Sequence, residues 1–244
     1  LTPQGKIIVD FLIIKAPAGA GGGLFLDMPR ALTADLVKKL GFYKLRAKVV
    51  IEDLSDSLGV TAVWNADTAP DGALTVRDPR HPALGWRVIG PLPAGAHDET
   101  PADAYQAHRI GLGIPEGGQD FAYGDAFPHE VDMDQLAGVA FDKGCFIGQE
   151  VVSRMQHRGT ARTRVVPVRF DGPAPEAGTE VTAGDKLIGQ MGSAAQGLGL
   201  AKLRLDRIED ALAAGHALTA GGIALTPVKP DWARFAWPGE TAPA

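Results

Sequence analysis

The chain has 244 residues, of which 45% are hydrophobic and 22% charged, and its formal net charge is -5. These values are typical of a globular protein, and the acidic balance argues against bulk nucleic-acid binding, which usually needs a basic surface. One cysteine excludes an internal disulfide and a closed structural zinc site built mainly from thiolates. No apolar run reaches the about 18 residues of a membrane-spanning helix, so we expect no membrane partner.

The first half of the chain mixes strand and helix patterns. Apolar runs at 6–16 and 23–28 flank a Pro- and Gly-rich stretch and predict a hairpin. Leucines at 32, 36 and 40 predict a short amphipathic helix that ends near Gly41. Further strands are predicted at 58–64, 73–76 and 84–90, and a further helix at 101–113. This order predicts an α+β domain with a largely antiparallel sheet.

After residue 164 the pattern changes to short apolar runs that are separated by Gly, Pro and Asp turns. Such a pattern predicts a small closed β-barrel or a sandwich. We therefore expect a domain boundary near 163–166, with a core at 1–164, a barrel at 165–230 and a tail at 231–244.

The only cysteine, Cys145, lies in the stretch KGCFIGQEVVSR. From Gly148 onward the sequence predicts a helix, with Glu150 and Arg154 four residues apart on one face. A helix N-terminus favours a nearby thiolate, and the charge of Lys143 acts in the same direction. The residues alone leave two interpretations open: a reactive or ligating thiol, and a small buried hydrophobic side chain.

A basic run follows the cysteine. Its members are Arg154, His157, Arg158, Arg162 and Arg164. The run predicts either an anion site or a solvated helix face with one Glu-Arg pair. The six histidines show no H-E-x-x-H spacing and there is no G-x-S-x-G motif, so the sequence predicts no metal site within one chain and no hydrolase site.

The stretch FDKGCFIGQEVVSRMQHRG resembles the signature K-G-C-[FY]-[IVL]-G-Q-E-x-x-x-R of the YgfZ family, which belongs to the folate-binding superfamily of the glycine-cleavage T-protein. Other stretches agree in the same order along nearly the whole chain: LTPQGKIIVDFLI, YKLRAKVVIED, DPRHPALGWR, YQAHRIGLGIPEGGQDFAYGDAFPHEVDMDQLAGVAF and LGLAKLRLD. T-protein shares the fold but lacks the cysteine of the signature. The resemblance implies a T-protein-like folate-binding core followed by a small C-terminal β-barrel.

The resemblance also implies a function. Members of the family bind tetrahydrofolate and serve the assembly or maintenance of iron-sulfur proteins, especially [4Fe-4S] enzymes. Their clients include radical enzymes that thiomethylate tRNA, so an effect on tRNA modification is expected to be indirect. Expected partners are iron-sulfur assembly proteins and [4Fe-4S] client enzymes, with no direct contact to nucleic acid. The role that the resemblance implies is that of an assembly factor rather than an enzyme. The composition, which resembles that of a high-GC bacterium, and the lack of a visible transit peptide in the residues present predict the bacterial cytoplasm as the location.

The signature carries over to Lys143, Gly144, Cys145, Gly148, Gln149, Glu150 and Arg154. Cys145 is then the functional thiol. One thiol cannot hold a cluster alone, since clusters usually have four ligands, so it would bind iron only transiently, together with a partner. Arg109 matches an arginine whose guanidinium could bind the folate glutamate tail, and Asp10 matches the acidic position beside the folate ring.

Two departures from the family pattern affect these expectations. Asp27 stands where the superfamily often has Asn, and this departure weakens the interpretation of the chain as an aminomethyltransferase. The family's usual segment before the PQGK strand is not seen in this sequence, and because that segment helps to close the pocket, we expect impaired folate binding. Two alternatives stay open: a folate-dependent aminomethyltransferase, which would depend on Asp10 rather than Cys145, and an RNA-binding module that uses the basic run.

Overall fold

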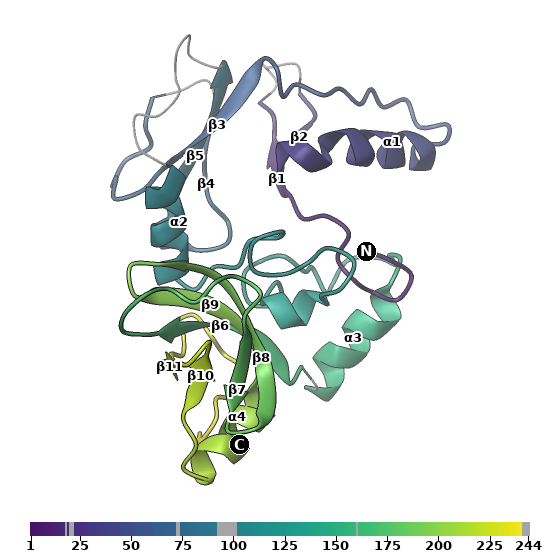
Figure 1. Cartoon of the computed structure of the whole chain (residues 1–244). Coiled ribbons are helices and arrows are strands. Elements are labelled where there is room, and N and C mark those ends of the chain that lie inside the picture. The colour runs from purple at the N-terminus through teal and green to yellow at the C-terminus, as the bar shows by residue number, and fades with distance from the viewer. Residues whose placement is uncertain (18, 20–21, 72–73, 92–101, 160, 241–244) are drawn as a thin grey trace. The chain divides into compact units, whose positions relative to one another are not determined.

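The computed structural model describes residues 1–17, 19, 22–71, 74–91, 102–159 and 161–240 (Figure 1). The chain forms two compact units. The first, here named the barrel unit, contains Leu1–Ile8 and Ala102–Ala244, and the second, the sheet unit, contains Val9–Pro101. Among the described residues no helix is both long and apolar enough to cross a membrane.

The sheet unit contains two small antiparallel sheets and one α-helix. Its elements are β1 (Leu12–Lys15), β2 (Leu24–Asp27), η2 (Arg30–Leu32), α1 (Thr33–Tyr43), β3 (Leu58–Val63), β4 (Leu74–Arg77), η3 (Pro82–Leu84) and β5 (Trp86–Pro91). Strands β1 and β2 form the predicted hairpin, and the second sheet has the order β3-β5-β4. The predicted strand start at Ala73 and the predicted helix start at Pro101 lie outside the described residues.

The barrel unit contains the remaining elements. They are α2 (Ala102–Gly111), η4 (Pro128–Val131), α3 (Gln149–Arg158), β6 (Thr163–Arg169), β7 (Glu180–Ala183), β8 (Lys186–Ala195), β9 (Leu198–Arg204), α4 (Leu205–Ala213), β10 (Leu218–Ala220) and β11 (Ile223–Pro227). The six strands close in the order β10-β11-β6-β9-β8-β7. The predicted α+β class with a C-terminal barrel is thereby confirmed, whereas α4 and β10 were not predicted.

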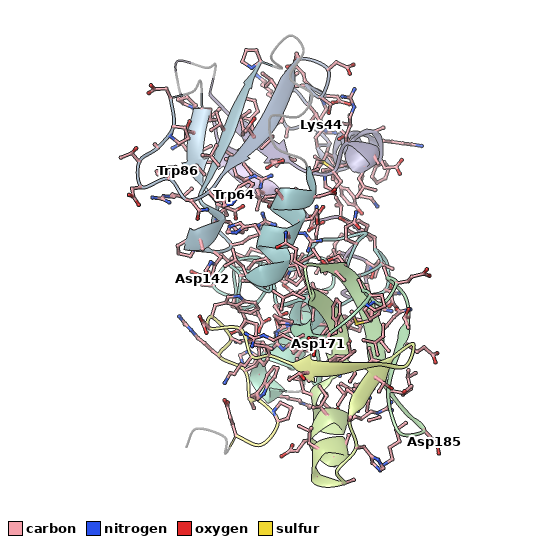
Figure 2. All side chains as sticks on the ribbon, turned by 60° about the vertical axis from the view of Figure 1, so that its left-hand side comes forward. Lys44, Trp64, Trp86, Asp142, Asp171 and Asp185 are labelled. Atoms are coloured by element: carbon pink, nitrogen blue, oxygen red, sulfur yellow. The ribbon has the colours of Figure 1, made fainter. Side chains whose placement is uncertain are left out.

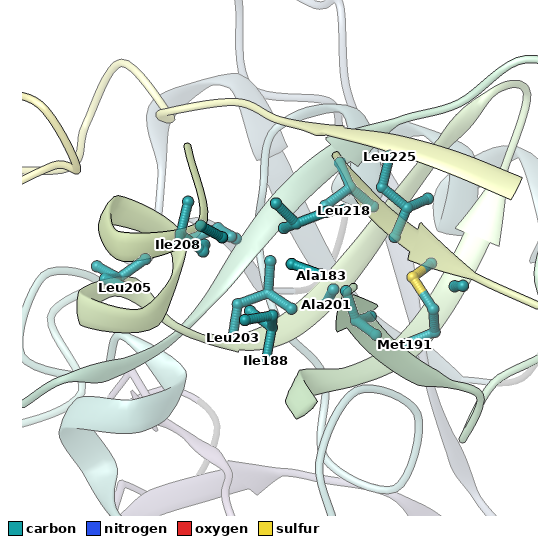
Figure 3. Close-up of a cluster of buried hydrophobic side chains, with 14 of the residues drawn as sticks. Ala183, Ile188, Met191, Ala201, Leu203, Leu205, Ile208, Leu218 and Leu225 are labelled. Carbon is teal, nitrogen blue, oxygen red and sulfur yellow. The ribbon is translucent and has the colours of Figure 1, made fainter. Parts of the chain in front are cut away.

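A dense apolar core fills the barrel (Figure 3). Ile188, Leu203 and Leu218 point inward from three different strands and are at most 1% exposed. Helix α4 packs Leu205 and Ile208 against the same core. Burial of this many aliphatic side chains supplies the main driving force for folding of the unit, since each contributes about 1.5–3 kcal/mol.

The predicted domain boundary near 163–166 lies at the first residues of β6, but the compact units group residues 102–162 with the barrel. The predicted tail is described as far as residue 240, and Phe235 and Trp237 pack against the barrel core. Trp232 Nε1 donates a hydrogen bond to Leu112 O at 2.8 Å. Residues 241–244 of the tail lie outside the described residues.

Candidate functional site

Residues 141–148, here named the thiol segment, lie on the surface of the barrel unit directly before α3. Cys145 is exposed, as are Phe141 and Ile147, which are 44% and 51% exposed. Lys143 Nζ lies 4.7 Å from the centroid of the Phe146 ring, a distance typical of a cation–π contact. The interpretation of Cys145 as a small buried hydrophobic side chain is therefore wrong.

The start of α3 packs against the N-terminal residues through two glycines, Gly148 and Gly5, and Figure 1 shows the N-terminus beside this helix. Gly148 has a φ of 83°, a left-handed conformation that favours glycine. A Cβ atom at this position would lie 2.6 Å from Thr2 O and 2.7 Å from the Cα of Gly5. The backbones of the PQGK and GQE stretches thus approach closely, which explains a glycine at each of these two positions.

Gly144 differs from Gly148, because a Cβ at Gly144 would meet no atom within 4 Å. Its own packing therefore gives no reason for a glycine beside the thiol. Open space on this side of Cys145 leaves room for another molecule to approach the sulfur.

Helix α3 carries the rest of the signature. Its first residue, Gln149, accepts a hydrogen bond at Oε1 from Phe146 N at 2.9 Å, whereas the N-cap residue Gly148 makes no side-chain capping bond. Arg154 Nη2 lies 2.6 Å from Glu150 Oε1, so the predicted pair forms, on an exposed face. Cys145 precedes the first helical residue by four positions. The thiol is thus outside the first turn, within which the effect of the helix dipole is largest.

The predicted basic run does not form one surface. Arg154 and Arg162 are 57% and 69% exposed, whereas Arg164 is buried at 6%. Arg164 bonds both carboxylate oxygens of Asp134, at 2.6 and 3.0 Å. Its guanidinium also lies 3.2 Å from Asp132 Oδ1. Because two carboxylates enclose its charge, Arg164 is not available to bind an external anion.

Asp132 is the most deeply buried acid of this cluster, with no exposed surface. Burial raises its pKa well above the ordinary value, and the charge of Asp134 acts in the same direction, although Arg164 opposes both. One oxygen of Asp132 has no protein partner among the described residues, and neither has Nε of Arg164. The sequence did not predict this cluster, because it joins residues that are 30 or more positions apart.

Arg109 is fully buried in a second polar network that links α2 to β8. Its Nη1 lies 2.6 Å from Asp120 Oδ2, and its Nη2 lies 3.0 Å from Ser193 Oγ. Its Nε lies 2.6 Å from Gln106 Oε1 and 2.9 Å from Glu116 Oε2. As placed, the guanidinium has no exposed donor to offer a folate carboxylate. Folate binding through Arg109 stays a prediction, and it would require the guanidinium to leave some of these partners.

The two other acids considered for folate chemistry lie in the sheet unit. Asp10 is half-buried and precedes β1. Asp27 Oδ2 accepts a hydrogen bond from Arg87 Nε at 2.5 Å, and Arg87 also reaches Asp78 at 3.4 Å. Although burial opposes it, the hydrogen bonds and charge of Arg80, aided by the charge of Arg87, lower the pKa of Asp78. Asp27 therefore belongs to an ion-pair network instead of being a free polar group.

The described residues contain no group of three or more His, Cys, Asp or Glu side chains that could hold a metal. A groove of about 400 Å3 lies on the outer wall of the barrel, lined by residues that include Lys202, Arg204 and Arg207. None of the predicted site residues lines this groove. Figure 2 shows Asp142, an exposed side chain at the start of the thiol segment.

Known proteins match the chain over nearly its whole length. The mouse protein "Iron-sulfur cluster assembly factor IBA57, mitochondrial" is 34% identical over 265 residues, which cover 98% of this chain and 71% of that protein. The human protein of the same name is 32% identical, with the same two coverages. The chain belongs to the IBA57 family.

Two further comparisons concern parts of the chain. A family model described as "CAF17, C-terminal beta-barrel domain" matches residues 162–235, which contain the barrel. Among solved structures, the glycine cleavage system aminomethyltransferase T from Bartonella henselae is similar over 55% of this chain and 39% of that chain, with a TM-score of 0.40 and 17% identity. The IBA57 relatives confirm the predicted family at that level, and the CAF17 model matches its barrel, while the narrower assignment to YgfZ stays a prediction.

The prediction of a bacterial cytoplasmic location is contradicted, because the IBA57 relatives that match this chain are named as mitochondrial proteins. The prediction used the resemblance of the composition to that of a high-GC bacterium and the lack of a visible transit peptide in the residues present. Location depends on address signals that receptors read. Composition therefore could not decide it.

Proposed function

We propose that this chain assembles or maintains iron-sulfur proteins, and that Cys145 is a transient thiolate ligand of the cluster. The observation that carries the proposal is the exposure of Cys145 within a segment that matches the signature. A ligating thiolate must reach iron, so exposure is a requirement. The names of the matching IBA57 relatives, which are iron-sulfur cluster assembly factors, support the same function.

The remaining ligands of the cluster come from a partner. Clusters usually have four thiolate ligands, and this chain has one cysteine. An iron-sulfur assembly protein supplies the others, and [4Fe-4S] enzymes receive the product. Radical enzymes that thiomethylate tRNA are among the proposed clients, so that loss of this chain would alter tRNA modification without direct RNA binding.

The surroundings of Cys145 support transfer between two proteins. Gly144 leaves open space beside the thiol, and exposed apolar side chains of Phe141 and Ile147 lie in the same segment. A partner that covers these side chains would exclude water from the cluster during transfer, which prevents side reactions.

Tetrahydrofolate is the proposed cofactor, and the resemblance to the folate-binding superfamily supports it. Asp10 is the residue through which this part of the proposal can be tested, because its carboxylate is half-buried and lies outside the enclosed network of Arg109. Folate would act as a bound regulator or a one-carbon carrier.

The test is reconstitution of an apo [4Fe-4S] client enzyme with a purified iron-sulfur scaffold protein, ferrous iron, a sulfide source and this chain. Cluster absorbance and client activity are followed over time. Cys145→Ser should lower the rate at least about tenfold, since even outer groups of metal sites contribute that much. Asp142→Asn changes an exposed neighbour and should leave the rate unchanged.

A Cys145→Ser variant that is as active as the parent would overturn the ligand role of Cys145, and a parent chain that does not speed cluster formation would overturn the assembly function. The folate part is tested by adding tetrahydrofolate to the same assay. A rate increase that is lost in Asp10→Asn supports it, whereas no response to tetrahydrofolate contradicts the folate part alone.

A further inference from the structure

His129 is a buried side chain that contacts both ends of the region around Cys145. It lies in η4 and is 1% exposed. Its ring centroid lies 5.9 Å from that of Phe141, and its Nε2 lies 3.0 Å from Gln156 Oε1. Phe141 precedes Cys145 in the chain, and Gln156 follows it in α3. One imidazole therefore contacts a residue that precedes the thiol in the chain and a residue of the helix that follows it.

The backbone of His129 is attached to the barrel. Its carbonyl oxygen accepts a hydrogen bond from Arg164 Nη1 at 2.6 Å. Arg164 lies in β6, which pairs with β9 and β11 in the closed barrel, and is held by the carboxylate of Asp134. The imidazole thus extends from a rigid base, because strands of a closed barrel cannot shift independently.

The other contacts of the residues between Phe141 and α3 are local ones of Phe146, with Lys143 over its ring and Gln149 on its N–H. Cys145 and Ile147 are exposed, and Gly144 has open space around it. The contact between Gly148 and Gly5 fixes only the C-terminal end of the thiol segment. At the other end, the ring of His129 lies beside that of Phe141 and so restrains this side chain.

We propose that His129 is a positioning residue for Cys145, which holds both flanks of the thiol on the barrel and so limits the range of positions that the sulfur visits. Nε2–H donates to the amide oxygen of Gln156, and the ring lies beside Phe141. The inference rests on the proposed function only in its last step, in which a limited range speeds cluster transfer. A ligand that is ordered before its partner arrives loses less freedom on binding.

The first test uses the single thiol as a probe. A nitroxide spin label on Cys145 reports on this segment alone, because the chain has no other cysteine. Gln156→Ala removes the hydrogen bond of His129 from an exposed helix position, so the fold should remain intact. We expect the label to move about two- to tenfold faster, the range that corresponds to one hydrogen bond. His129→Leu should have the same effect or a larger one.

Two controls separate positioning from general loosening. His129→Gln keeps an N–H donor near the Nε2 position and should restore most of the parent spectrum. Arg154→Ala removes a hydrogen bond of the same helix that faces solvent, and should leave the label unchanged. An unchanged spectrum in Gln156→Ala would overturn the proposal, even if His129→Leu fails to fold.

The second test uses the unlabelled variants in client reconstitution. Gln156→Ala should slow the reaction about two- to tenfold, and His129→Gln should stay near the parent rate. If the label responds and the rate does not, the link between positioning and transfer is wrong. If Cys145→Ser is as active as the parent, the proposed ligand role of Cys145 fails, while the spin-label result still decides whether His129 positions the thiol.

Discussion

The barrel and the thiol segment belong to one unit but are built in opposite ways. The barrel strands bury their inward side chains completely, as Val166 and Leu203 show with 0% exposure. The thiol segment exposes Cys145 and leaves open space around Gly144. Buried barrel residues thus supply the stability of the unit, while exposed residues of the thiol segment supply the proposed reactivity, as expected when a rigid scaffold carries an exposed functional loop.

The largest effect on stability is expected in the barrel. Leu203→Ala removes a fully buried side chain and should lower the free energy of unfolding by about 2–5 kcal/mol. Ile147→Ala shortens an exposed side chain of the thiol segment and should change it by less than about 0.5 kcal/mol. Urea denaturation of both variants measures the difference, and equal losses would remove the distinction between the two regions.

A smaller effect is expected where the thiol segment meets α3. Gly148→Ala places a side chain at positive φ and against Thr2 O, which should lower the free energy of unfolding by about 1–3 kcal/mol. Gly144→Ala has space for its methyl group and should change it by less than about 0.5 kcal/mol. Thermal denaturation of the two variants checks this, and a destabilised Gly144→Ala would show that the segment is packed more tightly than described.

The smallest expected effect is the pH dependence of the free energy of unfolding that Asp132 causes. Asp132 lies in the polar cluster of Arg164 and Asp134. Its pKa is raised in the folded state by burial. The folded protein therefore keeps a proton that the unfolded chain releases above about pH 4, and this contribution to stability is lost as the pH rises toward the folded pKa. Asp132→Asn cannot release a proton.

Relative to Asp132→Asn, the parent should lose up to about 1.4 kcal/mol of unfolding free energy per pH unit within that window. Urea denaturation of both proteins at several pH values from about 4 upward measures the difference. Parallel curves for the two proteins would contradict a raised pKa at Asp132.

Local patterns were sufficient to predict much of the fold. Leucine spacing predicted α1, and Gly148 marked the start of α3. Helix α4 was missed although Leu205, Ile208 and Ala211 recur at helical spacing. The helix follows β9 without an intervening turn residue, so its first residues continue an apolar strand pattern.

The buried polar networks could not be predicted in this way. Arg109 bonds Ser193, which lies 84 positions later, and Arg164 bonds His129 across 35 positions. Charged residues are usually exposed, so sequence reasoning predicts a surface position for them unless their buried partners are known. The signature identified the thiol but not its exposure, which depends on how the segment packs on the barrel unit.

Closure of the barrel also determines where this protein can pair with another chain through its backbone. Every barrel strand has a neighbour on both sides, although β11 pairs with β6 at only two positions. In the sheet unit, β3 and β4 are the outer strands of the order β3-β5-β4, and within the described residues each has one edge without a strand partner. Strand addition by a second chain, and the aggregation that can begin with it, is therefore favoured at these outer strands of the sheet unit.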